Sequence, residues 1–403
     1  MPDHPDLIPR ADAVESVLAS RIRAQEHRST EAVSLDAIGG RVAAEPIVAE
    51  HDQPPRSHAT MDGYAVDASD PYPLEVVETE VFPEDDAPNM GAGTAVPVAT
   101  GAPVPDNATA VLKREDVTVE DGQLDGPDVA DGTYVYEQGS NVAAGETLVE
   151  AGERLGPKDA ILLRDIGHES VTVYEPFTAG VLATGTEIHE GRTLDLDSPM
   201  LSGLVRAWGH EATYEGTVPD EADRVENRIR KLAEAYDVVI TTGGTSVGHK
   251  DHVISALQAL GDLQFHRVSV RPGKPIALAE LPAHDAVAFA IPGKPIGAYT
   301  VATAVMRPFF NGDASLPSEP ATLARDIGLG VSGFEYFVPV TLENGEAMPL
   351  GHVDSPLQVY DATFDPSVLS SSSRATRADG FFVTEAAVSA GETVQVVPYA
   401  VVE

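Results

Sequence analysis

Four short stretches of the sequence combine glycine with residue types that bind anions or metal ions. They are Thr184–Glu187 (TGTE), Thr241–Asp251 (TTGGTSVGHKD), Arg271–Pro275 (RPGKP) and Ile291–Pro295 (IPGKP). Glycine lets backbone N–H groups turn toward a ligand, and hydroxyl and ammonium groups add donors for a phosphate or carboxylate. None of the four has the G-x-x-x-x-G-K-[ST] spacing of a P-loop, so nucleotide hydrolysis of that kind is not indicated.

The Thr241–Asp251 stretch is the strongest candidate for an anion-binding turn. Its predicted contributors are Gly243, Gly244, Ser246 and Gly248. Glu187 and Asp251 follow neighbouring predicted strands, and two acids facing bound phosphate would suit a divalent cation between them. The alternative is a tight glycine turn into a helix that Asp251 caps, with Glu187 a solvated acid like many of the 64 acids in this chain.

The positive charges of the chain are concentrated near these stretches. Three of only six lysines (Lys250, Lys274 and Lys294) lie in them, and Arg267 and Arg271 lie nearby. The chain has 64 acidic and 26 basic residues, a net charge of -38. Positive charge retained around one cleft of so acidic a protein indicates a polyanionic ligand.

The elements around these stretches predict an α/β domain. Buried strands are expected at Ala179–Thr184, Asp237–Thr242, Phe265–Val270 and Ala286–Ile291. Helices are expected at Arg10–Arg28, Ser198–Trp208, Asp220–Tyr236, Asp251–Leu260 and Ile296–Phe309. Alternating helices and continuously apolar strands predict a parallel sheet covered on both faces, with ligands bound beyond the carboxyl ends of the strands.

The regions on either side of this domain consist of short runs of residues with high β-propensity, separated by proline, glycine and aspartate. Strands are predicted within Leu74–Val81, Thr109–Val119, Thr133–Gln138 and Ser170–Tyr174, with a helix at Pro157–Asp165. Two motifs of this region, Ser57–Asp67 and Val98–Val111, are each no more than turns when taken alone. After Pro317–Pro320, which reads as a linker, alternating strands and glycine turns predict a small β-barrel or sandwich.

Composition excludes several classes of protein. A length of 403 residues predicts two or three domains, and 42% hydrophobic residues are enough for folded cores. The net charge opposes binding to nucleic-acid phosphates and suggests a carboxylate-coated surface adapted to a salt-loaded cytoplasm. The absence of cysteine excludes disulfides and thiolate metal sites. With neither a leader-like N-terminus nor an apolar run of roughly 20 residues, we expect a cytoplasmic protein with no membrane partner.

Taken together and in this order, the motifs resemble the MoeA/gephyrin E-domain family, the molybdopterin molybdenumtransferases. The matching segments are MDGYA (61–65), TGAPVP (100–105), TGTE (184–187), TGGTSVGHKD (242–251), RPGKP (271–275), PGKP (292–295) and RATRADG (374–380). Each motif is weak alone, but the ordered set spans nearly the whole chain and is highly specific.

The resemblance implies a homodimer of elongated, multidomain chains that use Mg2+ to insert molybdate into adenylylated molybdopterin, with release of AMP. The implied fold is a central mixed or parallel α/β domain with β-rich domains before it and a small C-terminal β-barrel. The implied domains are 1–26 with 176–316 (molybdopterin binding), 27–46 with 147–175 (linker), 47–146 (a β-rich domain that reaches the partner's site) and 317–403 (barrel).

Specific residues receive roles through the resemblance. Catalytic roles fall on Asp62, Glu187 and Asp251, and metal binding falls on Glu187, Asp220, Glu221 and Asp251. Substrate binding falls on Thr100, Gly243, Gly244, Ser246, Gly248, Arg267, Arg271, Lys274, Pro292, Gly293, Lys294 and Pro295. Asp62 and Thr100 belong to the β-rich domain and would reach the site of the partner subunit.

Several positions depart from the family pattern. Thr186 and Thr147 stand where the family has acids, Pro199 replaces an asparagine, and Lys294 replaces the asparagine of PGNP. No base occurs in Phe334–Pro339, where an arginine is usual. These changes leave open a non-catalytic cofactor-binding protein or scaffold. A stand-alone adenylyltransferase is disfavoured, because such proteins lack the β-rich half.

Overall fold

The structure, a computed structural model, describes residues 7–244 and 252–403. The chain divides into two compact units. The first unit comprises Met1–Glu31 and Val173–Glu403, and the second unit comprises Ala32–Thr172. No helix in the described ranges is long and apolar enough to cross a membrane.

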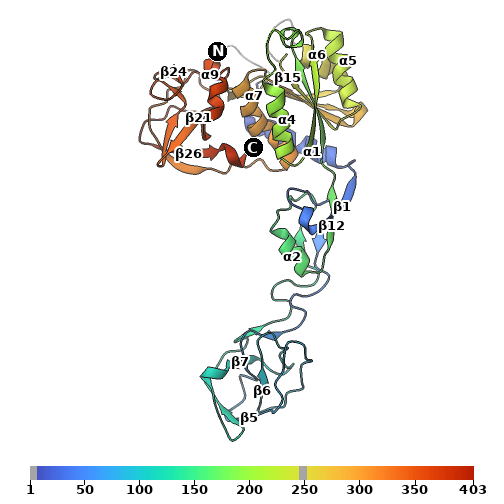
Figure 1. Cartoon of the computed structure of the whole chain (residues 1–403), viewed down its shortest axis with the longest axis vertical. Helices are drawn as coiled ribbons and strands as arrows, with labels where there is room; N and C mark the ends of the chain where they lie inside the picture. The colour runs from blue at the N-terminus through green and yellow to red at the C-terminus, as the bar shows by residue number, and fades with distance from the viewer. Residues whose placement is uncertain (1–6, 245–251) are drawn as a thin grey trace. The chain divides into compact units, whose positions relative to one another are not determined.

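A six-stranded sheet in the order β14-β13-β15-β19-β18-β16 forms the centre of the first unit (Figure 1). Its strands are β13 (Thr178–Thr184), β14 (Glu211–Val218), β15 (Val238–Thr242), β16 (Asp262–His266), β18 (Ala277–Leu281) and β19 (Ala286–Ile291). Strands β14, β13, β15 and β19 are parallel, whereas β18 is antiparallel to both of its neighbours. Every residue of β15 is buried, and the strand lies between β13 and β19, so the central position predicted for it is confirmed.

Helices cover both faces of this sheet, because successive strand residues point to opposite sides. Val238 and Ile240 pack with α1 (Arg10–Gln25), α4 (Asp197–Ala207), α7 (Pro295–Val301) and α8 (Arg307–Asn311). Val239 packs with α5 (Ala222–Ala233) and α6 (His252–Leu260) on the other face. The doubly covered α/β sheet predicted from apolar periodicity is therefore present.

Two predicted elements are each divided. The stretch Phe265–Val270 is not one strand: β16 ends at His266, and β17 (Val270–Arg271) pairs instead with β21 of the C-terminal sheet. The extended path is broken at Arg267, which has a φ of 77°. Between α7 and α8, residues Ala302–Met306 form a π-helical turn.

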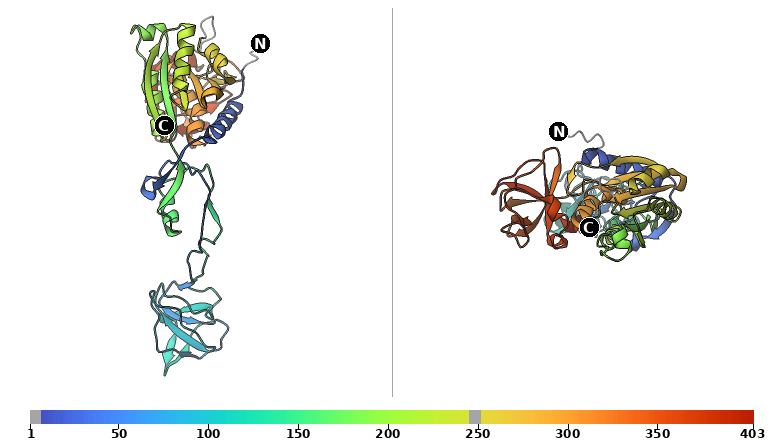
Figure 2. Two further views of the ribbon diagram at one scale, coloured as in Figure 1. Left: turned by 90° about the vertical axis from the view of Figure 1, so that its right-hand side faces the viewer. Right: turned by 90° about the horizontal axis from the view of Figure 1, so that it is seen from above.

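The C-terminal part of the first unit is a closed five-stranded barrel, seen in red and orange in Figure 2. Its strands are β20 (Glu319–Leu323), β21 (Glu335–Glu343), β22 (Glu346–Pro349), β25 (Gly380–Thr384) and β26 (Thr393–Pro398), and the β21–β25 pairing closes it. Val338 and Phe382 point into its own core, whereas Phe337 and Phe381 join the core of the α/β sheet. Between β22 and β25 lie β23 (Gly351–His352), β24 (Gln358–Tyr360) and the short helix α9 (Pro366–Leu369).

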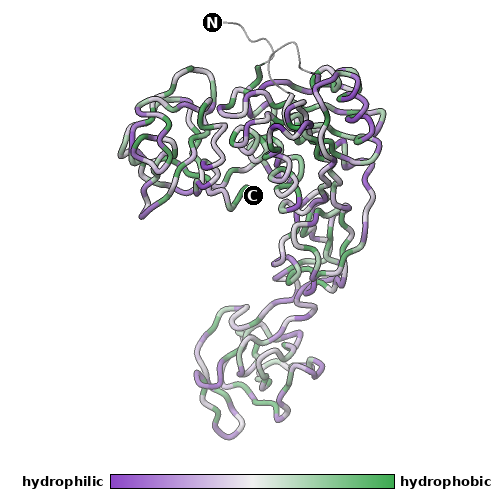
Figure 3. The backbone as a smooth tube through the Cα atoms, turned by 45° about the horizontal axis from the view of Figure 1, so that its top comes forward, coloured by the Kyte–Doolittle hydropathy of each residue, from purple (hydrophilic) through white to green (hydrophobic). Residues whose placement is uncertain are grey.

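The second unit is built on a six-stranded sheet in the order β7-β4-β6-β5-β9-β8. Its strands are β4 (Gly63–Val66), β5 (Leu74–Val76), β6 (Thr94–Val98), β7 (Ala110–Lys113), β8 (Thr118–Glu120) and β9 (Gln123–Asp125). These strands are shorter than the stretches from which they were predicted. Hydrophilic and hydrophobic segments alternate over short distances along this part of the chain, as the colours of Figure 3 show. Two apolar clusters, one around Val96 and Val98 and the other around Ala95 and Leu124, form the cores of this sheet.

Smaller elements complete the second unit. The pairs β2 (Ile47–Val48) with β11 (Thr147–Val149) and β3 (His58–Ala59) with β10 (Val135–Tyr136) are antiparallel. Helix α2 (Asp159–Asp165) lies within the predicted range 157–165. Strand β1 (Thr30–Ser34) pairs with β12 (Ser170–Tyr174) where the chain passes between the two units.

Candidate functional site

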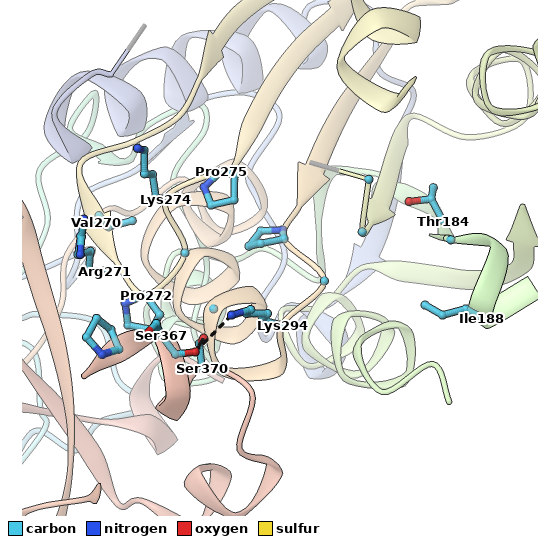
Figure 4. A pocket seen from close by; sticks show the side chains of 18 of the residues that line it. Thr184, Ile188, Val270, Arg271, Pro272, Lys274, Pro275, Lys294, Ser367 and Ser370 are labelled. Carbon is cyan, nitrogen blue, oxygen red and sulfur yellow. Dashed lines mark hydrogen bonds between the residues drawn. The ribbon is translucent and has the colours of Figure 1, made fainter. Parts of the chain in front are cut away.

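A cavity of about 520 Å3 lies where the strand-end loops of the α/β sheet meet the C-terminal barrel (Figure 4). Its walls come from the loops after β13, β15 and β19, from the turn after β17, and from α9. Nine predicted site residues line it: Glu187, Asp220, Gly243, Gly244, Arg271, Lys274, Pro292, Gly293 and Lys294. The cavity thus lies at the carboxyl ends of the parallel strands, where ligands of open α/β sheets bind.

Glycine is needed where the strand ends approach each other. Gly243 has a φ of 84°, and a Cβ there would lie 2.6 Å from the carbonyl oxygen of Thr184. A Cβ on Gly293 would lie 3.1 Å from the Cα of Gly243. The N–H of Gly243 donates to the carbonyl of Ile291 over 3.1 Å and so joins the ends of two strands. The prediction that this N–H faces a ligand is therefore wrong.

A cationic group, consisting of Arg271, Lys274 and Lys294, gives the cavity its charge. The Arg271 guanidinium lies 4.3 Å from the centre of the Phe334 ring, and the Lys274 ammonium lies 5.9 Å from it. Burial lowers the pKa of Lys274, and the positive charges of Arg267 and Arg271 lower it further. Within the described residues, no acidic side chain forms an ion pair with any member of the cationic group. Positive charge gathered in this way favours a bound anion.

Lys294 connects the α/β sheet to the barrel across the cavity. Its ammonium donates to the carbonyl of Ser367 over 3.2 Å, as the dashed line in Figure 4 shows. The N–H of Ile296, at the start of α7, donates to the carbonyl of Ser370 over 3.0 Å. Ser367, Ser370 and Pro366 line the cavity but were not predicted, because only the folded chain brings α9 to the strand ends.

The two acids of the lining follow the ends of the neighbouring strands β13 and β14. Glu187 is in α3 (Thr186–His189), and Asp220 follows β14. The Thr186 hydroxyl accepts a hydrogen bond from the N–H of Asp220 (3.1 Å), and the N–H of Thr186 donates to the Asp220 carboxylate (3.4 Å). Thr186, which stands where the family has an acid, therefore positions Asp220.

Other predicted residues do not line the cavity. Glu221 is exposed and pairs with Arg224 over 2.9 Å. Arg267 is not part of the lining, although its charge lowers the pKa of Lys274, and Pro295 begins α7. Ser246, Gly248 and Asp251 lie outside the described residues, which contain no group of three or more His, Asp or Glu side chains able to hold a metal ion.

In the second unit, Asp62 and Thr100 form a pair of their own. Asp62 Oδ1 accepts hydrogen bonds from the N–H and the hydroxyl of Thr100, both over 2.7 Å. The backbone hydrogen bond from Thr100, followed by its side-chain bond, lowers the pKa of Asp62. A Cβ on Gly63 would lie 1.9 Å from the Leu112 carbonyl oxygen, so the tight pairing of β4 with β7 requires glycine after Asp62. Asp62 is thereby held exposed and ionised.

The fold and the cavity define a class: a multidomain α/β protein with a cavity at the ends of its parallel strands that is lined by glycines and by the cationic group. Comparison with known families agrees. Residues 8–167 match the family described as MoeA N-terminal region (domain I and II). Residues 180–312 match the family described as probable molybdopterin binding domain.

Individual relatives match across both parts. A protein of Synechococcus elongatus named molybdopterin molybdenumtransferase is 29% identical over 317 residues, which cover 73% of this chain and 78% of the relative. A protein of Haemophilus influenzae with the same name is 28% identical over 393 residues, covering 92% of this chain and 94% of the relative.

Solved structures extend the likeness to the whole fold. A crystal structure of the molybdopterin biosynthesis MoeA protein from Pyrococcus horikoshii OT3 has a TM-score of 0.75 at 25% identity and covers 98% of this chain and 100% of its own. Another MoeA structure, from an organism given as Pyrococcus horikosii, has a TM-score of 0.69 at 28% identity and covers 98% of this chain and 99% of its own. The chain belongs to the MoeA family.

Proposed function

We propose that this protein is a molybdopterin molybdenumtransferase, which inserts molybdate into adenylylated molybdopterin and releases AMP. The observation that carries the proposal is the cationic group, whose three members line one cavity and form no ion pair among the described residues, in a chain with a net charge of -38. An adenylylated pterin phosphate is a polyanion of the kind this cavity would attract. The names of the curated relatives support the same activity.

The chain's own residues would bind and orient the substrate. Arg271, Lys274 and Lys294 would pair with phosphate oxygens through charge-assisted hydrogen bonds. The glycines of the strand ends let the ligand approach the backbone closely, as phosphate-binding turns do. Water would attack one phosphorus atom of the phosphoanhydride and break its bond to the bridging oxygen. The hydroxyl stays on the attacked phosphorus and the proton goes to the phosphate that leaves, so the products are AMP and the phosphate of the metal-bearing pterin.

The residues of the cavity fit a magnesium ion. Mg2+ is commonly held by one or two carboxylates together with substrate phosphates, and the lining of the cavity contains the carboxylates of Glu187 and Asp220. Asp251 stays a predicted third ligand. Bound there, Mg2+ would offset negative charge on the phosphates, while Thr186 keeps Asp220 in place.

We infer that the protein acts in the cytoplasm as a homodimer. Thr100 holds the exposed Asp62 carboxylate in place through two hydrogen bonds, which leaves a fixed negative charge on the surface of the second unit. In our proposal, Asp62 of the partner subunit completes the cavity. The domain boundaries expected from the resemblance are part of this proposal: the domain 47–146, which contains Asp62 and Thr100, would extend to the cavity of the partner subunit.

The test of the activity is AMP release by purified protein in molar salt, given adenylylated molybdopterin, molybdate and Mg2+. Lys274→Ala should raise the KM roughly 10- to 100-fold, because a charge-assisted hydrogen bond contributes about 1.5–3 kcal/mol. Lys158→Ala, which removes the same charge from an exposed position in the second unit, should leave the KM unchanged. Equal effects of the two substitutions would remove the cationic group from the proposal.

Completion of the site by a partner is tested with mixed dimers. Asp62→Asn and Lys274→Ala chains should each be nearly inactive as pure dimers at limiting substrate. Each mixed dimer would contain one cavity with both an intact Asp62 and an intact Lys274 and should work at up to about half of the wild-type rate, so a random equal mixture should reach up to about a quarter. A mixture no more active than its components, with exchange of subunits verified, would argue that each chain completes its own site.

A further inference from the structure

Several buried oxygen atoms are gathered at the start of α4, outside the cavity. Asp197, Ser198 and Ser202 are 6%, 0% and 3% exposed. Asp197 Oδ1, Ser198 Oγ and Ser202 Oγ are buried and have no hydrogen-bond partner within the described residues. The neighbouring Asp195 also has a buried Oδ2, but its carboxylate lies close to the Tyr214 hydroxyl: burial raises the pKa of Tyr214, and the charge and hydrogen bond of Asp195 raise it further. Buried polar atoms are almost always paired, so three such atoms without partners at the start of one helix indicate a ligand or ordered water.

The two carboxylates are close neighbours. The N–H of Ser198 donates to Asp195 Oδ1 over 3.0 Å, which keeps Asp195 at the first turn of α4. Burial raises the pKa of Asp197 to about 6 against the hydrogen bond from Thr242, and the charge of Asp195 raises it too. Ser198 and Ser202 are four residues apart in the helix and so lie on the same face.

We propose that Asp195, Asp197 and Ser198 bind a hard cation such as K+, Na+ or Mg2+, with Ser202 one turn further along the same face. Carboxylate and hydroxyl oxygens are the ligands that hard cations prefer. A cation would supply a partner for the free oxygens and offset the repulsion between the two acids, whereas a water molecule would do only the first.

This site is separate from the Glu187–Asp220 pair but connected to the cavity. Asp197 Oδ2 accepts from the Thr242 hydroxyl (3.0 Å), and the Thr242 carbonyl accepts from the Thr184 hydroxyl (3.0 Å). Thr184 lines the cavity, and Gly243 follows Thr242 directly. A cation at Asp197 would therefore stabilise the hydrogen bonds through Thr242 that hold the turn at Gly243 in place.

The test compares thermal unfolding of the full chain in choline, sodium, potassium and magnesium chlorides at equal ionic strength. At least one small cation should raise the Tm above its value in choline chloride, and the rise should saturate with concentration. Asp195→Asn should lose most of this ion-specific rise. Asp223→Asn, which removes an exposed acid from the first turn of α5, should keep it. An unchanged rise in Asp195→Asn would overturn the proposal.

Two further variants keep the test decisive. Ser198→Ala leaves every charge in place but removes a proposed ligand, so it should weaken the apparent cation affinity at least roughly tenfold, the smallest cost expected even for an outer-shell partner. An unchanged affinity would overturn the site. Glu187→Gln should retain the ion-specific rise. Its loss in that variant would show that the stabilising cation binds at the cavity wall, and the proposal would fail whether or not the protein releases AMP.

Discussion

The three cations of the cavity are each held by a different kind of contact. Arg271 stacks on Phe334, Lys274 lies over the same ring with its pKa lowered by burial, and Lys294 donates a hydrogen bond to the carbonyl of Ser367. Lys274 and Lys294 could be found from the sequence, because lysine is so rare in this chain that its positions carry information, and Arg271 could be found because it begins the RPGKP stretch. Ser367 and Ser370 carried no such signal, since serine on a surface loop is ordinary until the fold brings α9 to the cavity.

Among single residues, Gly273 is predicted to tolerate no side chain, either for stability or for substrate binding. It has a φ of 112°, and a Cβ there would lie 2.3 Å from Val301 Cγ1 on α7. Gly273→Ala should lower the free energy of unfolding by about 1–3 kcal/mol or more and should weaken substrate binding, because the turn carries Arg271 and Lys274.

Gly203→Ala is the matched control for this substitution. Gly203 lies within α4, has an ordinary φ, and a Cβ there would meet nothing within 4 Å. Alanine should raise the free energy of unfolding by roughly 0.5–1 kcal/mol, since glycine is costly inside a helix. Chemical denaturation in constant salt measures both, and a Gly273→Ala protein as stable as wild type would contradict the strained turn.

At the scale of elements, the alternation of apolar strands and helices predicted the three parallel strands β13, β15 and β19 at the middle of the sheet and the helices that cover them. Ala286–Ile291 coincides with β19, and Ser170–Tyr174 coincides with β12. β14 and β18 were not predicted, because β14 is an edge strand with a mixed burial pattern and β18 is separated from β19 by only a short turn. The division between β16 and β17 depends on the left-handed conformation of Arg267, which residue type does not indicate.

Helix α5 offers a quantitative test of the packing on one face of this sheet. Ile229 is fully buried among Leu182, Val239 and Leu257. Ile229→Ala should lower the free energy of unfolding by about 2–5 kcal/mol, as removal of a buried branched side chain does. Lys231→Ala, on the exposed side of the same helix, should change it by less than about 0.5 kcal/mol. Similar effects of the two would mean that α5 does not cover the sheet as described.

At the scale of the whole molecule, a net charge of -38 dominates the expected behaviour in solution. Repulsion among carboxylates reaches about 30 Å at 0.01 M salt and only about 3 Å at 1 M. The Tm should therefore rise steadily as KCl is added, and choline chloride should provide most of this general screening. Sucrose at matched osmolality should not replace salt. A Tm that does not depend on ionic strength would contradict the proposed adaptation to high salt.

The central claim is that the cationic cavity belongs to an enzyme and not to a passive carrier. Its most direct test is a single turnover in which protein is loaded with adenylylated molybdopterin and then given molybdate and Mg2+. We predict one AMP released and one molybdenum atom retained in the pterin for each substrate consumed, with little AMP released when molybdate is omitted. Stable binding of adenylylated molybdopterin with no AMP released after molybdate is added would contradict the account.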